Sequence, residues 1–225
     1  MEIYKSVELV KSRCSSLFVI SFNALDISAN NMELSENTKK VFEKVLEDSK
    51  KFPIDRGEKR IIKNILQKPE TRWINDAVWK LEELGVLLWS LNLHKEMPFI
   101  GKQFSADTFL LMKEIEKVDS FRPIEDVERY YKYLKNVNWR FHFDFFKSMN
   151  KTGEGESNEE IILRRVTELK EDGTMEEIID GDFTFEGVSF PKLSFVKKDS
   201  IKRLTELRME VFTCLTEDEE DDWEE

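Results

Sequence analysis

The 225-residue chain is long enough to bury a substantial hydrophobic core, and its 40% hydrophobic and 12% aromatic content excludes a disordered polymer. Its 8 glycines and 5 prolines are too few for a barrel or sandwich built from many tight turns. The formal net charge of −11 is unevenly spread, since residues 1–150 hold 25 lysines and arginines against 23 acidic residues, whereas residues 151–225 hold 10 against 23.

The acidic residues gather at the C-terminal end. Residues 217–225 read EDEEDDWEE and carry a net charge of −8, which predicts an acidic tail attached to a single helical domain over residues 1–216. A phosphate backbone needs a row of lysines and arginines that displaces its counterions, so a nucleic-acid partner is unlikely on this composition. The most basic stretch, residues 39–68, spreads its charges around predicted helices, which is typical of a solvated face.

Cysteines and apolar segments bear on the compartment. Cys14 and Cys214 are too few for the disulfide framework of a secreted fold of this size. The apolar stretch Ser16–Leu25 has a weak likeness to a signal peptide, but Glu2 and Glu8 oppose a positive leader, and a buried helix or strand is the better interpretation. No segment approaches the roughly eighteen continuous apolar residues of a membrane span. We therefore expect a cytoplasmic protein with no membrane partner.

The next elements are predicted to be short surface helices. Residues 41–52 place their apolar side chains along one stripe of a helix. Pro53 and Gly57 interrupt this pattern, and residues 58–68 then form a second stripe that ends before Pro69.

A tryptophan-rich helix is predicted to be the centre of the fold. Residues 73–93 read WINDAVWKLEELGVLLWSLNL and hold three of the five tryptophans. Their apolar residues follow helical spacing, and the second half is apolar on nearly every side, so residues 73–92 need neighbours on most faces. Trp79 and Trp89 are expected to pack between neighbouring helices rather than to form a ligand platform.

Further helices and a loop follow. Ser105 is predicted to cap a helix over residues 105–118, and Pro123 precedes another over residues 124–134. The aromatic run at residues 138–146 fits both strand and helix periods, and its helical flanks favour a helix. Residues 150–157, NKTGEGES, predict a flexible loop.

The C-terminal third adds the one predicted β-hairpin. Ser157 and Glu160 form the capping-box pattern that opens a helix over residues 158–171, before Gly173. Residues 183–190 alternate apolar and polar side chains about Glu186-Gly187, which is typical of a hairpin. A last helix is expected over residues 196–215. The predicted fold is mainly α, a compact multi-helix domain with this small hairpin.

Three segments resemble the domain of unknown function 4272 family, mostly bacterial proteins with no assigned activity. Residues 79–91, WKLEELGVLLWSL, are similar to that family's WxxE…LLWAL helix. Residues 122–127, RPIEDV, followed by Trp139, are similar to its Arg-Pro/Ser-x-Glu-Glu helix with a downstream His-Trp. Residues 182–223 carry the hairpin, Leu207-Arg208 and a terminal Asp-Trp, similar to its ER…ALNWL and DW.

The resemblance covers about residues 70–223 and implies a helical fold without a mechanism. Two positions depart from the family pattern. Asn138 stands where the family has a histidine before Trp139, and Cys214 stands where it has a tryptophan.

Motifs for catalysis or metal binding are scarce. His94 and His142 are the only histidines, too few for a three-histidine metal site. His142 and Asp144 lie two residues apart and would not share a helix face. Glycine-rich phosphate loops and the HExxH, CxxC and GxSxG patterns do not occur. We therefore expect no metal and no cofactor.

The charged residues Glu82, Arg122 and Arg208 are the catalytic candidates. Burial would raise the pKa of Glu82 and make it a candidate general acid. The favoured interpretation is structural: Glu82 pairs with Arg72, Arg122 or Arg208 in a buried bridge, and Glu125 has a similar role.

The tail raises a separate hypothesis. A tryptophan is unusual in a purely solvating acidic segment, so Trp223, with Asp222, is predicted to dock on the folded body while the acidic residues face residues 39–68.

The sequence leaves the function open between two classes. The first is a non-catalytic protein-interaction module, such as an accessory or toxin-neutralising protein, favoured by the scarcity of catalytic motifs and by an acidic terminus suited to a basic partner. The alternative is an enzyme of unfamiliar type with a buried carboxylate–arginine site around Glu82. A nucleic-acid regulator is disfavoured by the charge.

Overall fold

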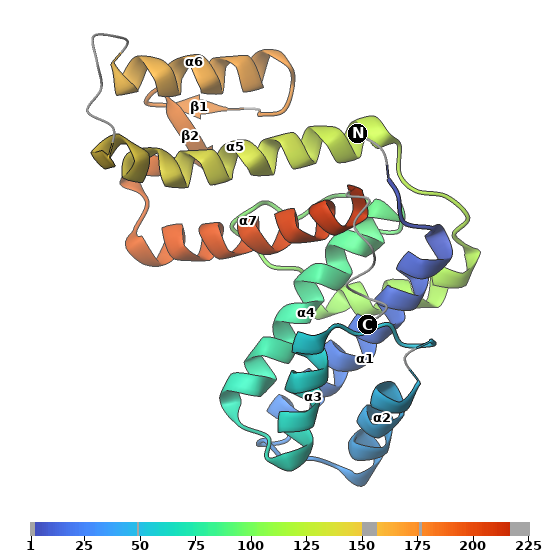
Figure 1. Cartoon of the computed structure of the whole chain (residues 1–225). Coiled ribbons are helices and arrows are strands. Elements are labelled where there is room, and N and C mark those ends of the chain that lie inside the picture. Colours follow the sequence, from blue (N-terminus) through green and yellow to red (C-terminus); the bar gives the residue numbers. More distant parts are fainter. Residues whose placement is uncertain (1–2, 49, 150–156, 176, 217–225) are drawn as a thin grey trace. The chain divides into compact units, whose positions relative to one another are not determined.

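A computed structural model describes residues 3–48, 50–149, 157–175 and 177–216 (Figure 1). Its contacts group into two compact units. The N-terminal unit holds the described residues of Glu2–Met97, Phe104–Arg122 and Thr213–Glu225, and the C-terminal unit holds those of Pro98–Gln103 and Pro123–Phe212. One domain over residues 1–216 was predicted from the sequence, and the contacts of the described residues among them fall into these two groups. The predicted mainly helical fold with a small antiparallel sheet is confirmed.

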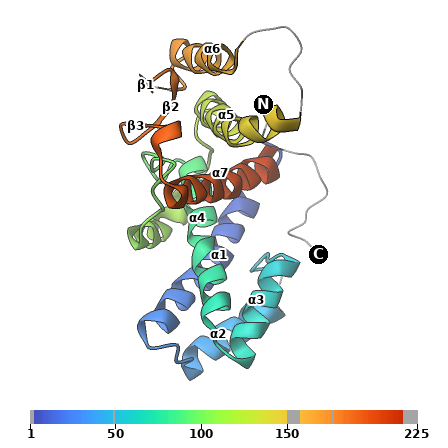
Figure 2. The same ribbon diagram turned by 90° about the vertical axis from the view of Figure 1, so that its left-hand side faces the viewer.

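The N-terminal unit is helical throughout. Its elements are α1 (Val7–Ala29), α2 (Glu36–Glu47), α3 (Arg56–Gln67), α4 (Thr71–Ser90) and the 3-10 helix η1 (Ala106–Lys117). Helix α1 lies along α4, while α3 contacts α4 and η1 contacts both α1 and α4 (Figures 1 and 2).

Helix α4 is the central element that its sequence predicted. Residues 84–91 are all buried, and Trp89 is only 5% exposed. Trp79 is half-buried, so the expectation of full enclosure holds for the second half of the helix and not for the first. The ring of Phe104 packs against the backbone of Gly85, where an added Cβ would lie 2.3 Å from the ring carbons.

The apolar core of this unit comes from α1, α2, α3, α4 and the turn before α3. These side chains are nearly excluded from solvent, and their burial is the main driving force for packing the four helices. They are Ile20, Ala24, Ile27, Phe42, Val45, Ile54, Ile61, Ile62, Ile65, Ile74 and Ala77.

The apolar stretch Ser16–Leu25 is helical, one of its two predicted states, and it is part of a longer helix, α1, whose N-cap Ser6 accepts a hydrogen bond from the Leu9 N–H. Some predicted boundaries were wrong. Helix α2 begins before residue 41 and ends at Glu47. Residues 106–117 form a 3-10 helix rather than an α-helix, and the Ser105 side chain makes no capping bond there. The predicted boundaries differ from the observed ones because an apolar stripe alone does not show at which residue a helix begins or ends.

The C-terminal unit combines long helices with a small sheet. It contains α5 (Ile124–Met149), α6 (Asn158–Glu171), β1 (Ile178–Ile179), β2 (Asp182–Phe185), β3 (Val188–Ser189) and the short 3-10 helix η2 (Phe190–Lys192). It also contains α7 (Phe195–Thr216) as far as Phe212. Helix α6 lies over β1 and β2 (Figure 2).

The predicted hairpin is confirmed and gains a strand. Strands β2 and β3 pair antiparallel around Glu186 and Gly187, whose φ angles of 51° and 74° are those of a tight primed turn. A second turn of the same kind at Asp180-Gly181, with φ angles of 56° and 72°, pairs β1 with β2.

Two more predictions in this unit are confirmed. The Ser157 and Glu160 capping box starts α6, and Gly173, with a φ of 72°, follows its end. The aromatic run at residues 138–146 continues α5 as a helix. Arg140 on that helix forms a bidentate pair with Asp182, with two of its bonds at 2.8 Å, and this pair ties the sheet to α5.

Among the described helices, none has both the length and the apolar character that crossing a membrane would require. The acidic tail at residues 217–225, including Trp223 and Asp222, lies outside the described residues, as does most of the predicted loop at residues 150–157.

Candidate functional site

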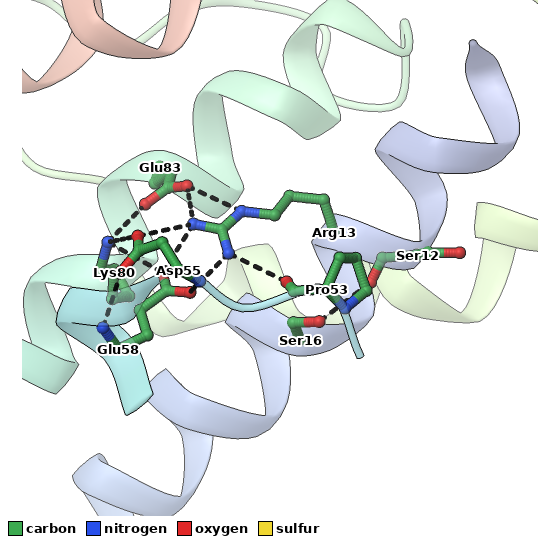
Figure 3. Close-up of polar contacts among 8 residues, drawn as sticks. All are labelled: Ser12, Arg13, Ser16, Pro53, Asp55, Glu58, Lys80 and Glu83. Atoms are coloured by element: carbon green, nitrogen blue, oxygen red, sulfur yellow. Dashed lines mark hydrogen bonds and ion pairs between the residues drawn. The ribbon is translucent and has the colours of Figure 1, made fainter. Parts of the chain in front are cut away.

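A cluster of charged side chains joins three helices of the N-terminal unit (Figure 3). Arg13 comes from α1, and Lys80 and Glu83 lie one turn apart on α4. Asp55 is the N-cap of α3 and Glu58 is its third residue, and the two form a reciprocal capping box. The same two acids that start α3 therefore also face the cations of α1 and α4.

Glu58 is the centre of the cluster. Its side chain is fully buried and accepts bonds from Arg13 Nη1 at 2.5 Å and Arg13 Nη2 at 2.6 Å. Lys80 Nζ lies 2.9 Å from Glu58 Oε1, and the Asp55 N–H donates to Oε2 at 3.1 Å. This number of donors offsets the cost of burying the carboxylate.

Arg13 is held on each side of its guanidinium. Its Nε donates to Glu83 Oε1 at 3.1 Å, and its Nη2 also bonds that carboxylate. Its Nη1 donates to the Pro53 carbonyl at 3.0 Å. Lys80 Nζ closes the ring of contacts at 2.9 Å from Glu83 Oε2. All three guanidinium nitrogens thus donate to protein oxygens.

The charges set the protonation state of the cluster. Burial opposes ionisation of Glu83, but the charges of Arg13 and Lys80 outweigh it and lower the pKa of Glu83 to about 2. Burial likewise opposes charge on Arg13 and Lys80, and the facing carboxylates outweigh it and raise the pKa of both cations. Glu83 is therefore ionised, and both cations are protonated, near neutral pH.

This arrangement favours a structural role over acid–base chemistry. A general base or acid needs a pKa near the working pH, and the pKa shifts of Glu83 and Lys80 move both groups away from it. The neighbouring Cys14 is buried, and burial raises the pKa of its thiol, which disfavours the nucleophilic thiolate.

Glu82, the carboxylate that was a catalytic candidate but was favoured as part of a buried bridge, is buried, with 3% exposed. Its Oε1 accepts a hydrogen bond from the Phe104 N–H at 2.6 Å. This hydrogen bond fixes the backbone of Phe104, whose ring packs on Gly85. Glu82 and Gly85 therefore both hold Phe104 against α4.

Arg122 binds the C-terminal end of α4. Its guanidinium lies 4.5 Å from the Trp89 ring centroid. Its Nε donates to the Trp89 carbonyl at 3.0 Å, and its Nη2 donates to the His94 carbonyl at 2.7 Å. Carbonyls at a helix end have no partner within the helix, and Arg122 supplies one.

Arg208 is fully buried on α7 in the C-terminal unit. Its Nη1 donates to the Pro98 carbonyl at 2.7 Å and to the Tyr130 hydroxyl at 2.9 Å, and its Nη2 donates to the Lys102 carbonyl at 2.8 Å. Glu82, Arg122 and Arg208 thus each form hydrogen bonds with backbone groups of their own unit.

The two histidines do not belong to a metal-binding group among the described residues. Burial is the main reason that the pKa of His94 is lowered, and its ring packs edge-on against Phe104 at 5.1 Å. His142 lies on α5. Within the described residues, no group of three or more histidine, cysteine, aspartate or glutamate side chains is placed to hold a metal ion.

An exposed aromatic surface lies on α1 and η1 of the N-terminal unit. The rings of Phe18, Phe22 and Phe109 contact one another with centroid distances of 5.4 to 5.5 Å. Phe22 is 48% exposed, and the adjacent η1 residue Leu110 is 59% exposed. These four residues are called the aromatic surface below.

Neither the charge cluster nor the aromatic surface was predicted from the sequence. Arg13 stands inside an apolar helix, and Asp55-x-x-Glu58 matches the capping-box pattern, so both signals were readable. Their meeting depends on how α1, α3 and α4 pack, which no local pattern specifies. Similarly, Phe18 and Phe22 share a helix face, but their contact with Phe109 is a tertiary one.

Comparisons with protein-family models, curated proteins and solved structures found no match for this chain. The resemblance to the domain of unknown function 4272 family therefore stays a prediction.

Proposed function

We propose that this protein is a non-catalytic interaction module of the cytoplasm, an accessory protein that binds a partner protein through the aromatic surface. The observation that carries the proposal is the exposure of Phe22, whose ring contacts those of Phe18 and Phe109, together with the exposure of Leu110, the residue that follows Phe109. Large apolar side chains grouped on a surface are typical of protein-binding sites, where aromatic residues supply much of the affinity.

The aromatic surface is distinct from the core face of α1. Leu17, Ile20 and Ala24 on that helix are fully buried, while Phe22 is half exposed. Covering the exposed parts of Phe22 and Leu110 would contribute roughly 1 kcal/mol each. The supporting rings of Phe18 and Phe109 hold Phe22 in place, which lowers the entropy lost on binding.

The ionised state of the charge cluster supports the same proposal. Its side chains are occupied in joining helices, so they serve as a scaffold for the surface on α1 rather than as a reaction centre.

The experiment is affinity capture with the full chain from host extract, quantified by mass spectrometry. The test variant is Phe22→Ser combined with Leu110→Ser. The matched control is Leu163→Ser, since Leu163 is a comparably exposed apolar residue, at 47%, on α6 of the C-terminal unit. Light scattering of each protein alone separates self-association from binding of a second protein.

We expect a partner that the native chain and the Leu163→Ser variant both retain and that the double variant loses at least tenfold. The proposal fails if the double variant keeps every partner, or if the control loses them equally.

A further inference from the structure

A pocket of about 350 Å³ lies between α5 and α6 in the C-terminal unit. Its size is at the lower end of the range for small-ligand sites. Residues of one face of α5 and one face of α6 line it, and most of them are basic or polar. They are Lys132, Lys135, Asn136, Arg165, Glu168 and Leu169.

Arg165 is positioned in this pocket by uncharged partners. Its Nε donates to Asn136 Oδ1 at 2.6 Å, and its guanidinium lies 5.5 Å from the Trp139 ring centroid. Asn136 is buried, with 3% exposed, and its own amide donates to the Lys132 carbonyl. Over the described residues, Arg165 has no carboxylate partner, and its Nη1 and Nη2 make no hydrogen bond.

The two lysines add positive charge on the opposite wall. Lys135 Nζ lies 4.5 Å from the Tyr131 ring centroid and, within the described chain, forms no ion pair. Lys132 pairs with Asp172. The one acid of the lining, Glu168, lies 3.7 Å from Arg164, which is outside the pocket. The lining keeps an excess of positive charge.

We infer that the α5/α6 pocket binds the phosphate group of a small phosphate monoester. A guanidinium held at Nε presents its two Nη groups as a fork, and this geometry matches two oxygens of a phosphate. Lys135 adds a second positive charge for the phosphate, and the buried Leu169 supplies an apolar contact for the esterified group.

The test is an NMR titration of the full ¹⁵N-labelled chain with inorganic phosphate and with methyl phosphate, at ionic strength held constant with chloride. The Nε–Hε signal of Arg165 reports the pocket directly, because that proton faces Asn136. We expect a saturable shift of this signal and of the neighbouring amides, with a Kd of about 1 mM or tighter.

Arg165→Gln should weaken this binding at least tenfold. Lys170→Gln is the matched control, because it removes one positive charge from an exposed side chain of the same helix that does not line the pocket. We expect it to change Kd by no more than about twofold, since exposed charges act weakly at a distance in salt. Lys135→Gln is a second test variant at an exposed position, with an expected loss of at least threefold.

The inference is overturned by the absence of a saturable shift at Arg165, by equal weakening in Lys170→Gln and Arg165→Gln, or by an equal shift with chloride alone. Binding of single-stranded RNA that phosphate does not displace would also overturn it, because the pocket would then be part of a larger surface.

Discussion

At the scale of single residues, the buried side chains of the charge cluster in the N-terminal unit are held by charges of the opposite sign. Glu58 is fully buried, yet it faces donors from α1, α4 and its own helix start. A buried ion cluster of this kind contributes little compared with well-packed apolar groups, but removing one member leaves the others buried without compensation. Its effect is to specify how α1, α3 and α4 pack.

Replacing Glu58 with glutamine should therefore destabilise the protein strongly. We expect a loss of about 3–5 kcal/mol in the free energy of unfolding, because Arg13 and Lys80 would keep their charges. Urea unfolding at pH 7 measures the change. The control is Glu8→Gln, since Glu8 is 79% exposed in its pair with Lys11, and its loss should be below about 1 kcal/mol. Equal effects of the two substitutions would contradict the central place of Glu58.

The lowered pKa of Glu83 predicts a pH dependence. Its pKa is about 2 in the folded chain and about 4.3 when unfolded. A depressed folded pKa means that the unfolded state binds the proton first, so the stabilisation is complete above about pH 5 and is lost as pH falls toward 2. The shift corresponds to about 3 kcal/mol.

The measurement compares unfolding of the native chain and Glu83→Gln from pH 7 to pH 2. We expect the difference in stability to be largest near neutral pH and to shrink below about pH 4. A difference that stays constant over this range would show that Glu83 is not ionised in the cluster.

At the scale of elements, apolar periodicity predicted most helices but not their contacts. Residues 158–171 carry a capping box and a following glycine, so both ends of α6 were predictable. Residues 106–117 carry a similar apolar stripe without an effective cap and form a 3-10 helix. The Asp180-Gly181 turn had a readable signature, but β1 has only two residues, too few to show alternation.

Gly85 tests the packing of α4. Alanine normally favours a helix by about 1 kcal/mol over glycine, but a Cβ here would lie 2.3 Å from the Phe104 ring. We therefore expect Gly85→Ala to lower stability by about 1–3 kcal/mol, as overpacked substitutions do.

The control for Gly85→Ala is the same substitution in a Phe104→Ala background. The clash is absent there, so alanine should stabilise the helix relative to glycine, as it normally does. Thermal unfolding of the four proteins gives the coupling between the two positions. Additive effects would contradict the close approach of Phe104 to α4.

At the scale of the whole molecule, the sequence predicted the class of fold but not the location of a functional site. The mainly helical architecture and the hairpin follow from periodicity and turn residues that act locally. The aromatic surface and the α5/α6 pocket each need residues from two elements, and single-sequence patterns do not pair elements. Glu82, Arg122 and Arg208 were named from the sequence as catalytic candidates or as members of a buried bridge, and each of them forms hydrogen bonds with backbone groups.

The most direct measurement is photo-crosslinking in the host with a benzophenone amino acid placed at position 22, and separately at position 163 on α6. We expect one discrete cross-linked protein from position 22 and none from position 163, and we expect the product to be lost when Leu110→Ser is added. Cross-linking that is equal at both positions, or absent from position 22, would contradict a partner seated on the aromatic surface.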